Sequence, residues 1–181
     1  MNRQITKVKL SKDSKVHIEY QIPRTTESGN DFDQFTLNCI DKPLPAFELA
    51  MLNLRKHVLD ICEMPVNDTE VMKIKVNGVS FSYSGDNYVM GATIMASKTL
   101  AKSNSPLLIN TPHKFDQPQN ENQGTEMCLS DDCVNVLVEL LEQAEKYIDG
   151  ERTQLEMFDK DQDKAVDKLD LTLVIPEAAE I

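Results

Sequence analysis

The sequence predicts an α+β fold: an antiparallel sheet of hairpins and meander strands, with two amphipathic helices packed on one face. Several runs alternate apolar and polar residues with a period of two, as half-buried strands do. Short turn-forming segments separate these runs, which favours antiparallel hairpins. Two other segments space their apolar residues three and four apart, as helices with one buried face do. The 181 residues suffice for one domain of ordinary size.

Two strands are expected near the start of the chain. Residues 5–10 and 15–22 are extended runs on either side of the turn-prone Lys12-Asp13-Ser14. In the second run apolar residues alternate with polar ones, and His17 falls on the polar face. We therefore expect His17 to be exposed to solvent rather than to act in catalysis.

A loop and a third strand are expected next. Pro23 should end the second strand, because proline lacks the amide donor that a strand needs. Residues 24–33 contain Gly29 and Asn30, which favour turns, and are predicted to form a loop. Residues 35–40 then alternate as a third strand.

The first helix is expected between Pro45, which suits a helix start, and Pro65, which cannot continue one. Glu48 lies near its start and Arg55-Lys56 lie later, an order that the helix dipole favours. The apolar residues of this segment form one stripe: Phe47, Ala50, Met51, Leu54, Val58 and Ile61.

Residues 71–84 are predicted to form a tight β-hairpin. Apolar and polar residues alternate on both sides of Asn77-Gly78, a pair that suits a two-residue type I′ turn. Pairing across this turn places the apolar residues on one face and keeps Lys73 and Lys75 out of the core. Residues 88–96 are expected to complete a three-stranded meander.

A short edge strand is expected around residues 107–110, because the prolines that flank it each remove a ladder donor. This edge is a candidate for pairing across a dyad, but the same prolines oppose extension, so the oligomeric state stays open. Residues 113–124 are rich in Gln, Asn and Pro and are predicted to form a surface loop.

A second helix is expected from Ser130 to Gly150. Ser130 suits the N-cap, the acidic pair at 131–132 suits the first turn, and Gly150 suits the position just past the helix end. The predicted apolar stripe consists of Val134, Leu137, Val138, Leu141, Ala144 and Ile148.

These elements predict a single α+β domain over residues 1–150 and an acidic C-terminal tail over residues 151–181. The tail mixes charges and has few apolar residues before the run at 169–175. That run is either a last strand or a segment that docks on something else.

The acidic composition limits the function classes. The chain carries 19 Lys and Arg against 30 Asp and Glu, a formal net charge of −11. A protein that neutralises many phosphates usually shows a basic excess, so direct nucleic-acid binding is expected to be weak at most. The sequence has neither a signal-peptide pattern nor an apolar span of about 20 residues, which predicts a cytoplasmic protein without membrane association.

No complete catalytic, metal-binding or cofactor-binding motif is present. The sequence lacks G-x-S-x-G and P-loop patterns, and its cysteines and histidines lack the spacing of zinc ligands. Cys39 and Cys62 are predicted to be free thiols that act as small buried hydrophobes. Asp159, Asp161 and Asp163 resemble three positions of a calcium loop without its glycine and closing glutamate. We predict a protein that is not an enzyme and has no metal or cofactor.

Lys98 and Lys102 are candidate phosphate contacts in a segment rich in hydroxyl side chains. Two lysines neutralise only a couple of phosphate charges, so such binding would be weak and sensitive to salt. The alternative is a flexible, solubilising loop.

The segment Gln154-Leu155-Glu156-Met157-Phe158 lies in the predicted tail. It resembles the short peptide by which bacterial polymerases and repair proteins bind the sliding clamp, with Met157 in place of the usual leucine. The resemblance implies that Leu155, Met157 and Phe158 enter an apolar groove while Gln154 orients the peptide. The alternative is a helix-end staple, in which Leu155 and Phe158 pack back on the domain.

The whole chain resembles small bacteriophage and prophage proteins that accompany replication or recombination genes. Gly150-Glu151-Arg152-Thr153 and the Gln154…Phe158-Asp159 tail carry this resemblance. It implies a non-enzymatic accessory protein whose tail binds a protein partner, with the sliding clamp as the candidate. The alternative is an acidic inhibitor or DNA mimic, whose folded domain binds a host DNA-binding protein.

Overall fold

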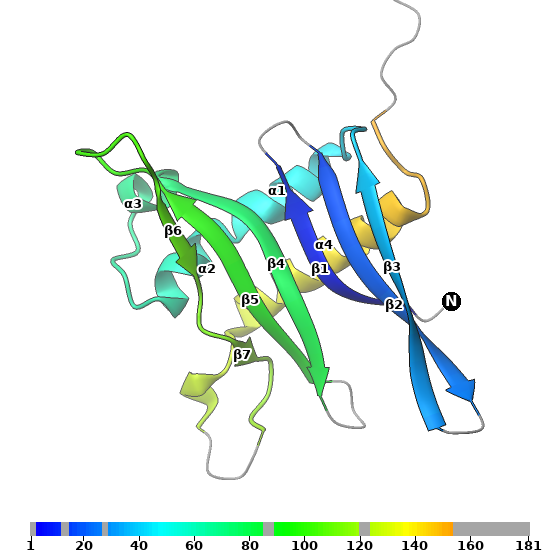
Figure 1. The fold of residues 1–181 in the computed structure, drawn as a ribbon. Helices are drawn as coiled ribbons and strands as arrows, with labels where there is room; N and C mark the ends of the chain where they lie inside the picture. Colours follow the sequence, from blue (N-terminus) through cyan, green and yellow to red (C-terminus); the bar gives the residue numbers. More distant parts are fainter. Residues whose placement is uncertain (1–2, 12–14, 27–28, 85–88, 120–123, 154–181) are drawn as a thin grey trace, which may run out of the picture.

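The computed structural model describes residues 3–11, 15–26, 29–84, 89–119 and 124–153. These residues form an antiparallel sheet with helices on one face, which confirms the predicted α+β fold (Figure 1). The strands lie in the order β3-β2-β1-β4-β5-β6, and β7 also pairs with β5. The elements are β1 (Gln4–Leu10), β2 (Val16–Thr26), β3 (Gly29–Cys39), α1 (Pro45–Asn53), α2 (Arg55–Ile61), α3 (Asp68–Met72), β4 (Ile74–Ser84), β5 (Val89–Lys98), β6 (Leu107–Asn110), β7 (Lys114–Phe115), the 3-10 helix η1 (Thr125–Met127) and α4 (Asp131–Ile148).

The sheet has two halves, β1–β2–β3 and β4–β5–β6, which meet along β1 and β4. The pairing of β1 with β4 covers only Lys7 with Ser80, Val8 with Val79, and Lys9 with Gly78. Beyond this short ladder the two halves separate, as Figure 1 shows between β4 and the β2–β3 ribbon.

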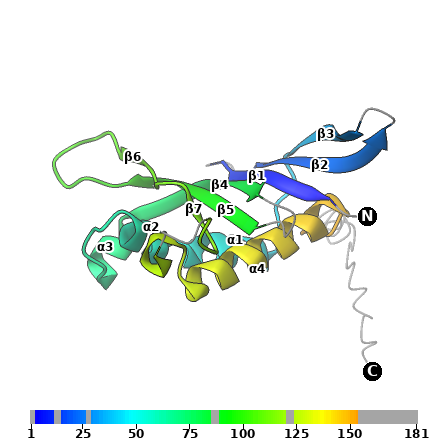
Figure 2. The same cartoon turned by 90° about the horizontal axis from the view of Figure 1, so that it is seen from below.

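Helices α1, α2 and α4 lie together beneath one face of the sheet (Figure 2). The rings of Phe47 in α1 and Tyr147 in α4 are 6.0 Å apart at their centroids and join the two helices. Both residues are almost fully buried, together with Leu54 and Val58 of the predicted stripe. Among the described residues, no helix covers the other face of the sheet, which we call the open face.

The predicted hairpin at Asn77-Gly78 is wrong. Strand β4 runs straight through these residues and pairs with β5 along its whole length, with a register shift between Val76 and Gly78. A β-bulge adds one residue, which moves the next apolar residue back to the face that the previous one occupies. Val76 and Val79 are therefore both buried in the same core, as the hairpin also required. The bulge explains the pattern without a turn.

The predicted loop at residues 24–33 is also wrong. Strand β2 continues past Pro23 to Thr26, and β3 begins at Gly29, so the two strands form a long ribbon. Beyond Gln21 strand β2 pairs with β3 but no longer with β1. A strand with one free edge tolerates a proline, which explains how Pro23 fits.

Two helical predictions need correction. The single helix expected before Pro65 is two consecutive helices, α1 and α2, which meet at Leu54. Val71 and Met72, expected to begin a strand, belong to the short helix α3. The Asn67 side chain accepts a hydrogen bond from the Glu70 amide at 3.0 Å, and this N-cap starts α3.

The ends of α4 are as predicted, but its buried face is not. The Ser130 hydroxyl accepts a hydrogen bond from the Cys133 amide, and Gly150 has a left-handed φ of 98°. Val138, predicted in the stripe, is 43% exposed. The stripe is rotated by about one residue and comprises Cys133, Leu137, Leu140, Gln143, Ala144 and Tyr147.

The predicted edge strand is confirmed, because β6 lies at one end of the sheet order. The loop expected over residues 113–124 contains the two-residue strand β7. Cys39 and Cys62 are half-buried, so their predicted burial is only partial. The run at 169–175 lies outside the described residues.

Candidate functional site

A cavity of about 630 Å³ lies at the edge of the sheet where β1 ends, β2 begins and β3 ends. We call it the β1–β2 groove; residues 9–11, 15–17 and 38–40 line it, together with Asn77 and Met95. Because side chains alternate along a strand, residues from both faces of the sheet line the groove. Val16 belongs to the core face of the sheet and His17 to the open face.

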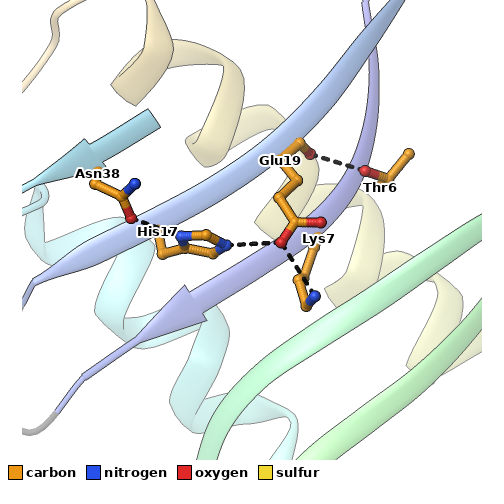
Figure 3. A network of polar contacts seen from close by, with 5 residues as sticks. All are labelled: Thr6, Lys7, His17, Glu19 and Asn38. Carbon is orange, nitrogen blue, oxygen red and sulfur yellow. Dashed lines mark hydrogen bonds and ion pairs between the residues drawn. The ribbon is translucent and has the colours of Figure 1, made fainter. Parts of the chain in front are cut away.

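A polar network on the open face holds His17 beside this groove (Figure 3). The His17 Nδ1 lies 2.6 Å from Asn38 Oδ1, and its Nε2 lies 2.8 Å from Glu19 Oε1. Lys7 Nζ donates to the same Glu19 oxygen at 3.1 Å, and Thr6 Oγ1 donates to the Glu19 carbonyl at 3.2 Å. Three neighbouring strands thus fix one imidazole ring.

The electrostatics of the network favour ionised Glu19. Its pKa is held below the usual value by the hydrogen bond from His17 and then by the one from Lys7, while partial burial opposes both. Asn38 Oδ1 and Glu19 Oε1 each face one of the two nitrogens of the His17 ring. Because both ring nitrogens are engaged, the ring acts as a structural and electrostatic element here.

The charge of the groove has one sign. Lys9 and Lys15 line it, and among the described residues that line it none is acidic. Leu10 and Ile40 add apolar surface, and Ile40 is 75% exposed. A cationic and apolar groove in a chain of net charge −11 fits a ligand that is both anionic and apolar.

The C-terminal end of the described chain is anchored next to this groove. Arg152 Nη1 donates to Asp41 Oδ2 at 2.9 Å and to Cys39 Sγ at 3.1 Å, and the guanidinium lies 4.7 Å from the centre of the Tyr147 ring. Thr153 donates through its amide to the Lys42 carbonyl at 3.1 Å and through its hydroxyl to the Pro43 carbonyl at 2.8 Å. The pKa of the Asp41 carboxyl is lowered by hydrogen bonds from Cys39 and then Arg152.

The predicted partner-binding residues Gln154, Leu155, Met157 and Phe158 lie outside the described residues. The predicted phosphate contact Lys98 pairs with Glu70 Oε2 at 2.6 Å, so a carboxylate already balances its charge. Lys102 is exposed in the segment between β5 and β6. The phosphate-contact hypothesis stays a prediction.

Sequence reasoning missed the cations of the groove. Lys7 and Lys9 alternate with Val8 and Leu10 in β1, and this period places both lysines on the open face. The sequence thus indicates the face on which these lysines lie. Only the fold shows that Lys15 and Asn38 line the same groove as Lys9.

His113 contacts two hydroxyl groups on the open face of the sheet. Its Nε2 lies 2.9 Å from Ser82 Oγ, and its Nδ1 lies 3.1 Å from Thr93 Oγ1. The ring is exposed, and a hydroxyl occupies the position where a Ser-His-Asp triad has a carboxylate. We therefore assign this group no catalysis.

Within the described parts of the chain, no three His, Cys, Asp or Glu side chains gather as metal ligands would. In the same residues no helix combines the length and apolarity that crossing a bilayer requires. The chain matches no protein-family model, no curated protein and no solved structure.

Proposed function

We propose that this protein is a non-enzymatic accessory factor of DNA replication or recombination, of the phage or prophage type. Residues 154–158 bind a protein partner, and the bacterial sliding clamp is the first candidate. The folded domain carries this peptide at its C-terminal end.

The observation that supports the proposal is the anchoring of Arg152 and Thr153. Thr153, the residue before the motif, is fixed to the domain by two hydrogen bonds, and the residue as a whole is exposed. The last described residue, Thr153, therefore lies at the surface beside the end of β3. A peptide tethered in this way reaches a partner while the domain stays folded.

Binding of the full chain to purified bacterial sliding clamp tests the proposal. We expect Leu155→Ala combined with Phe158→Ala to weaken binding at least about tenfold, because the two anchors that resemble clamp-binding residues are lost. Leu171→Ala combined with Leu173→Ala removes two large apolar side chains elsewhere in the tail and is the matched control. Equal binding by all three chains would refute clamp binding through this motif.

A second candidate function has a specific observation in its favour. Strands β1, β4 and β5 contain four lysines and no acidic residue, whereas α4 contains five carboxylates and one lysine. An acidic helix can imitate a nucleic-acid backbone for a DNA-binding protein. However, Asp132 and Glu145 have cationic partners, Lys56 and Arg3, which reduces the negative field that such a mimic needs.

Displacement of labelled duplex DNA from a purified bacterial nucleoid protein tests this alternative. Mimicry requires the wild-type chain to release DNA and Asp131→Asn with Glu142→Gln to release less. The tail variant Leu155→Ala/Phe158→Ala should then act like the wild type. If no chain releases DNA, the mimic hypothesis is wrong.

A further inference from the structure

The β1–β2 groove lies beside the place where the chain leaves the domain. Cys39 lines the groove, and its sulfur is 3.1 Å from Arg152 Nη1. Ile40 also lines the groove and precedes by three residues the Pro43 carbonyl that Thr153 contacts. Thr153, the last described residue, therefore lies close to the groove.

The reach of the next residues is sufficient. Three residues of extended chain, the separation of Ile40 from Pro43, span at most about 11 Å. The five residues from Gln154 to Phe158 span at most about 18 Å when extended. Their side chains can thus meet the groove without any movement of the domain.

The chemistry of residues 154–163 complements the groove. This segment contains three large apolar residues, Leu155, Met157 and Phe158, together with four carboxylates and a single lysine. The groove offers exposed aliphatic surface at Ile40, and the charged side chains that line it are Lys9 and Lys15. An apolar segment of opposite charge on the same chain also has a high local concentration.

We propose that the β1–β2 groove binds residues 154–163 of the same chain. Leu155 and Phe158 cover Ile40 and Leu10, and the following carboxylates lie near Lys9 and Lys15. This inference goes beyond the proposed function and is independent of clamp binding, because it concerns contacts within one molecule. If a partner also binds the motif, the groove competes with it and lowers its apparent affinity.

A nucleic acid is the main alternative occupant, because its phosphates would also be attracted by the lysines. The observations favour the tail, since Ile40 and Leu10 provide aliphatic surface that phosphates do not use. Asn77 and Met95 add no further positive charge to the groove.

Solution NMR of the full chain tests the proposal. We expect nuclear Overhauser effects between the methyl groups of Leu155 or Met157 and those of Ile40 or Leu10. Leu155→Ala with Phe158→Ala should remove these effects and shift the backbone amides of Val16, Asn38 and other groove residues. Leu171→Ala with Leu173→Ala is the control and should leave the groove resonances unchanged.

Two further measurements keep the test independent of any folding defect. A synthetic peptide of residues 154–163, added to the Leu155→Ala/Phe158→Ala chain, should return the groove amides to their wild-type positions. Lys9→Glu with Lys15→Glu should weaken this rescue at least about tenfold, as the loss of two attractive charges predicts.

Four outcomes would overturn the proposal. If neither the tail substitutions nor the peptide shifts the groove resonances, the tail binds elsewhere or not at all. Effects that follow the Leu171/Leu173 variant would assign the groove to residues 169–175. Effects that depend on protein concentration would assign it to the tail of a second copy. Shifts caused by a single-stranded oligonucleotide and not by the peptide would make it a phosphate site.

Discussion

The Tyr83 hydroxyl donates a hydrogen bond to the Ile5 carbonyl at 2.9 Å, across the gap where β1 and β4 no longer pair. Backbone pairing between these strands ends at Lys7 and Ser80. Beyond this point the Tyr83 side chain, rather than a backbone amide of β4, donates the hydrogen bond to the β1 carbonyl. Tyr83 is partly buried, and this burial raises the pKa of its hydroxyl to about 12. The group therefore stays a donor over the whole neutral range.

We predict that Tyr83→Phe lowers the free energy of unfolding by about 1 kcal/mol, because it removes one hydrogen bond and leaves the Ile5 carbonyl without it. Urea denaturation measures the change. Tyr20→Phe removes a phenol hydroxyl that makes no hydrogen bond in the described structure and should change stability by less than half as much. Equal losses in both variants would show that the Tyr83–Ile5 bond contributes nothing specific.

Gly78 lies at the β4 bulge, where β1 approaches closely. A Cβ at this position would lie 2.5 Å from the Val8 carbonyl oxygen, closer than van der Waals contact permits. We predict that Gly78→Ala costs about 2 kcal/mol or more, because the backbone of β1 must move. Thermal or urea unfolding measures the loss.

The control for this substitution is Gly124→Ala. The added Cβ there meets only the carboxylate end of the flexible Glu126 side chain, which can turn away. Its effect should stay within about 0.5 kcal/mol. A Gly78→Ala variant as stable as Gly124→Ala would contradict the close approach of β1 and β4.

The bulge also shows how far the sequence predicts this fold. Both a turn and a bulge at Asn77-Gly78 place Val76 and Val79 on one face, so the alternation of apolar residues cannot distinguish them. A bulge forms instead of a turn because β4 pairs with another strand along its whole length. That strand, β5, comes later in the chain, so the local pattern does not show it. Local patterns predicted the buried residues here, but not the topology.

The caps of α4 were predictable because they depend on local chemistry. Ser130 and Gly150 act on neighbouring backbone groups, so the sequence alone places them. The buried face of α4 differs from the predicted one because Val138 and Leu140 are both apolar, so the sequence alone cannot show that Leu140 is the buried residue. The candidate groove was not predicted, since it combines the ends of three strands.

Glu70 links α3 to the end of β5, and its ionisation should make the free energy of unfolding depend on pH at acidic values. Lys73 Nζ and Lys98 Nζ each lie 2.6 Å from a Glu70 oxygen, and these bonds lower the pKa of its carboxyl to about 2 from 4.5. The unfolded chain takes up this proton first as the pH falls, so the stabilisation present above pH 4.5 is lost towards pH 2. Carboxyl NMR should show the low midpoint.

Lys98→Met tests the cause of the low pKa. It removes one of the two cations, and we expect the Glu70 midpoint to move up towards 4.5. Lys102→Met removes a nearby lysine for which no ion pair is seen in the described residues, and should leave the midpoint unchanged. A midpoint unaffected by Lys98→Met would mean that this ion pair does not form in solution.

His57 should make the protein less stable in mild acid. The ring is 4% exposed, its Nε2 has no hydrogen-bond partner, and burial, followed by the charge of Lys56, lowers its pKa below 6.5. Between the lowered value and 6.5 the unfolded chain binds a proton that the native chain does not, so stability falls as the pH drops below 6.5. Asp60 and Asp132 oppose this effect in part.

We predict that His57→Leu loses less stability than the wild type when the pH is lowered from about 7.5 to about 5. Urea denaturation at both values measures the difference. His113→Gln removes an exposed histidine and should keep the wild-type pH dependence. If His57→Leu and the wild type respond alike, His57 does not titrate in this range.

The anchor at the end of the domain yields the last prediction. Arg152 pairs with Asp41 at 2.9 Å, and both side chains are partly exposed, at 26% and 43%. We expect a favourable coupling between Arg152→Met and Asp41→Asn in a double-mutant cycle, smaller at high salt. Arg152→Met should also speed hydrogen exchange of the Thr153 amide, which donates to Lys42.

Arg3→Met is the matched control for this anchor. Arg3 pairs with Asp149 at 2.6 Å and with Glu145 at 3.4 Å near the same end of α4, but it contacts neither Asp41 nor Thr153 in the described structure. Its loss should lower stability while Thr153 stays protected from exchange. Because Thr153 immediately precedes the tail motif, faster exchange in Arg152→Met alone would show that Arg152 fixes the point from which residues 154–158 extend. Unchanged exchange in both variants would mean that the hydrogen bonds of Thr153 to Lys42 and Pro43 are sufficient without the guanidinium.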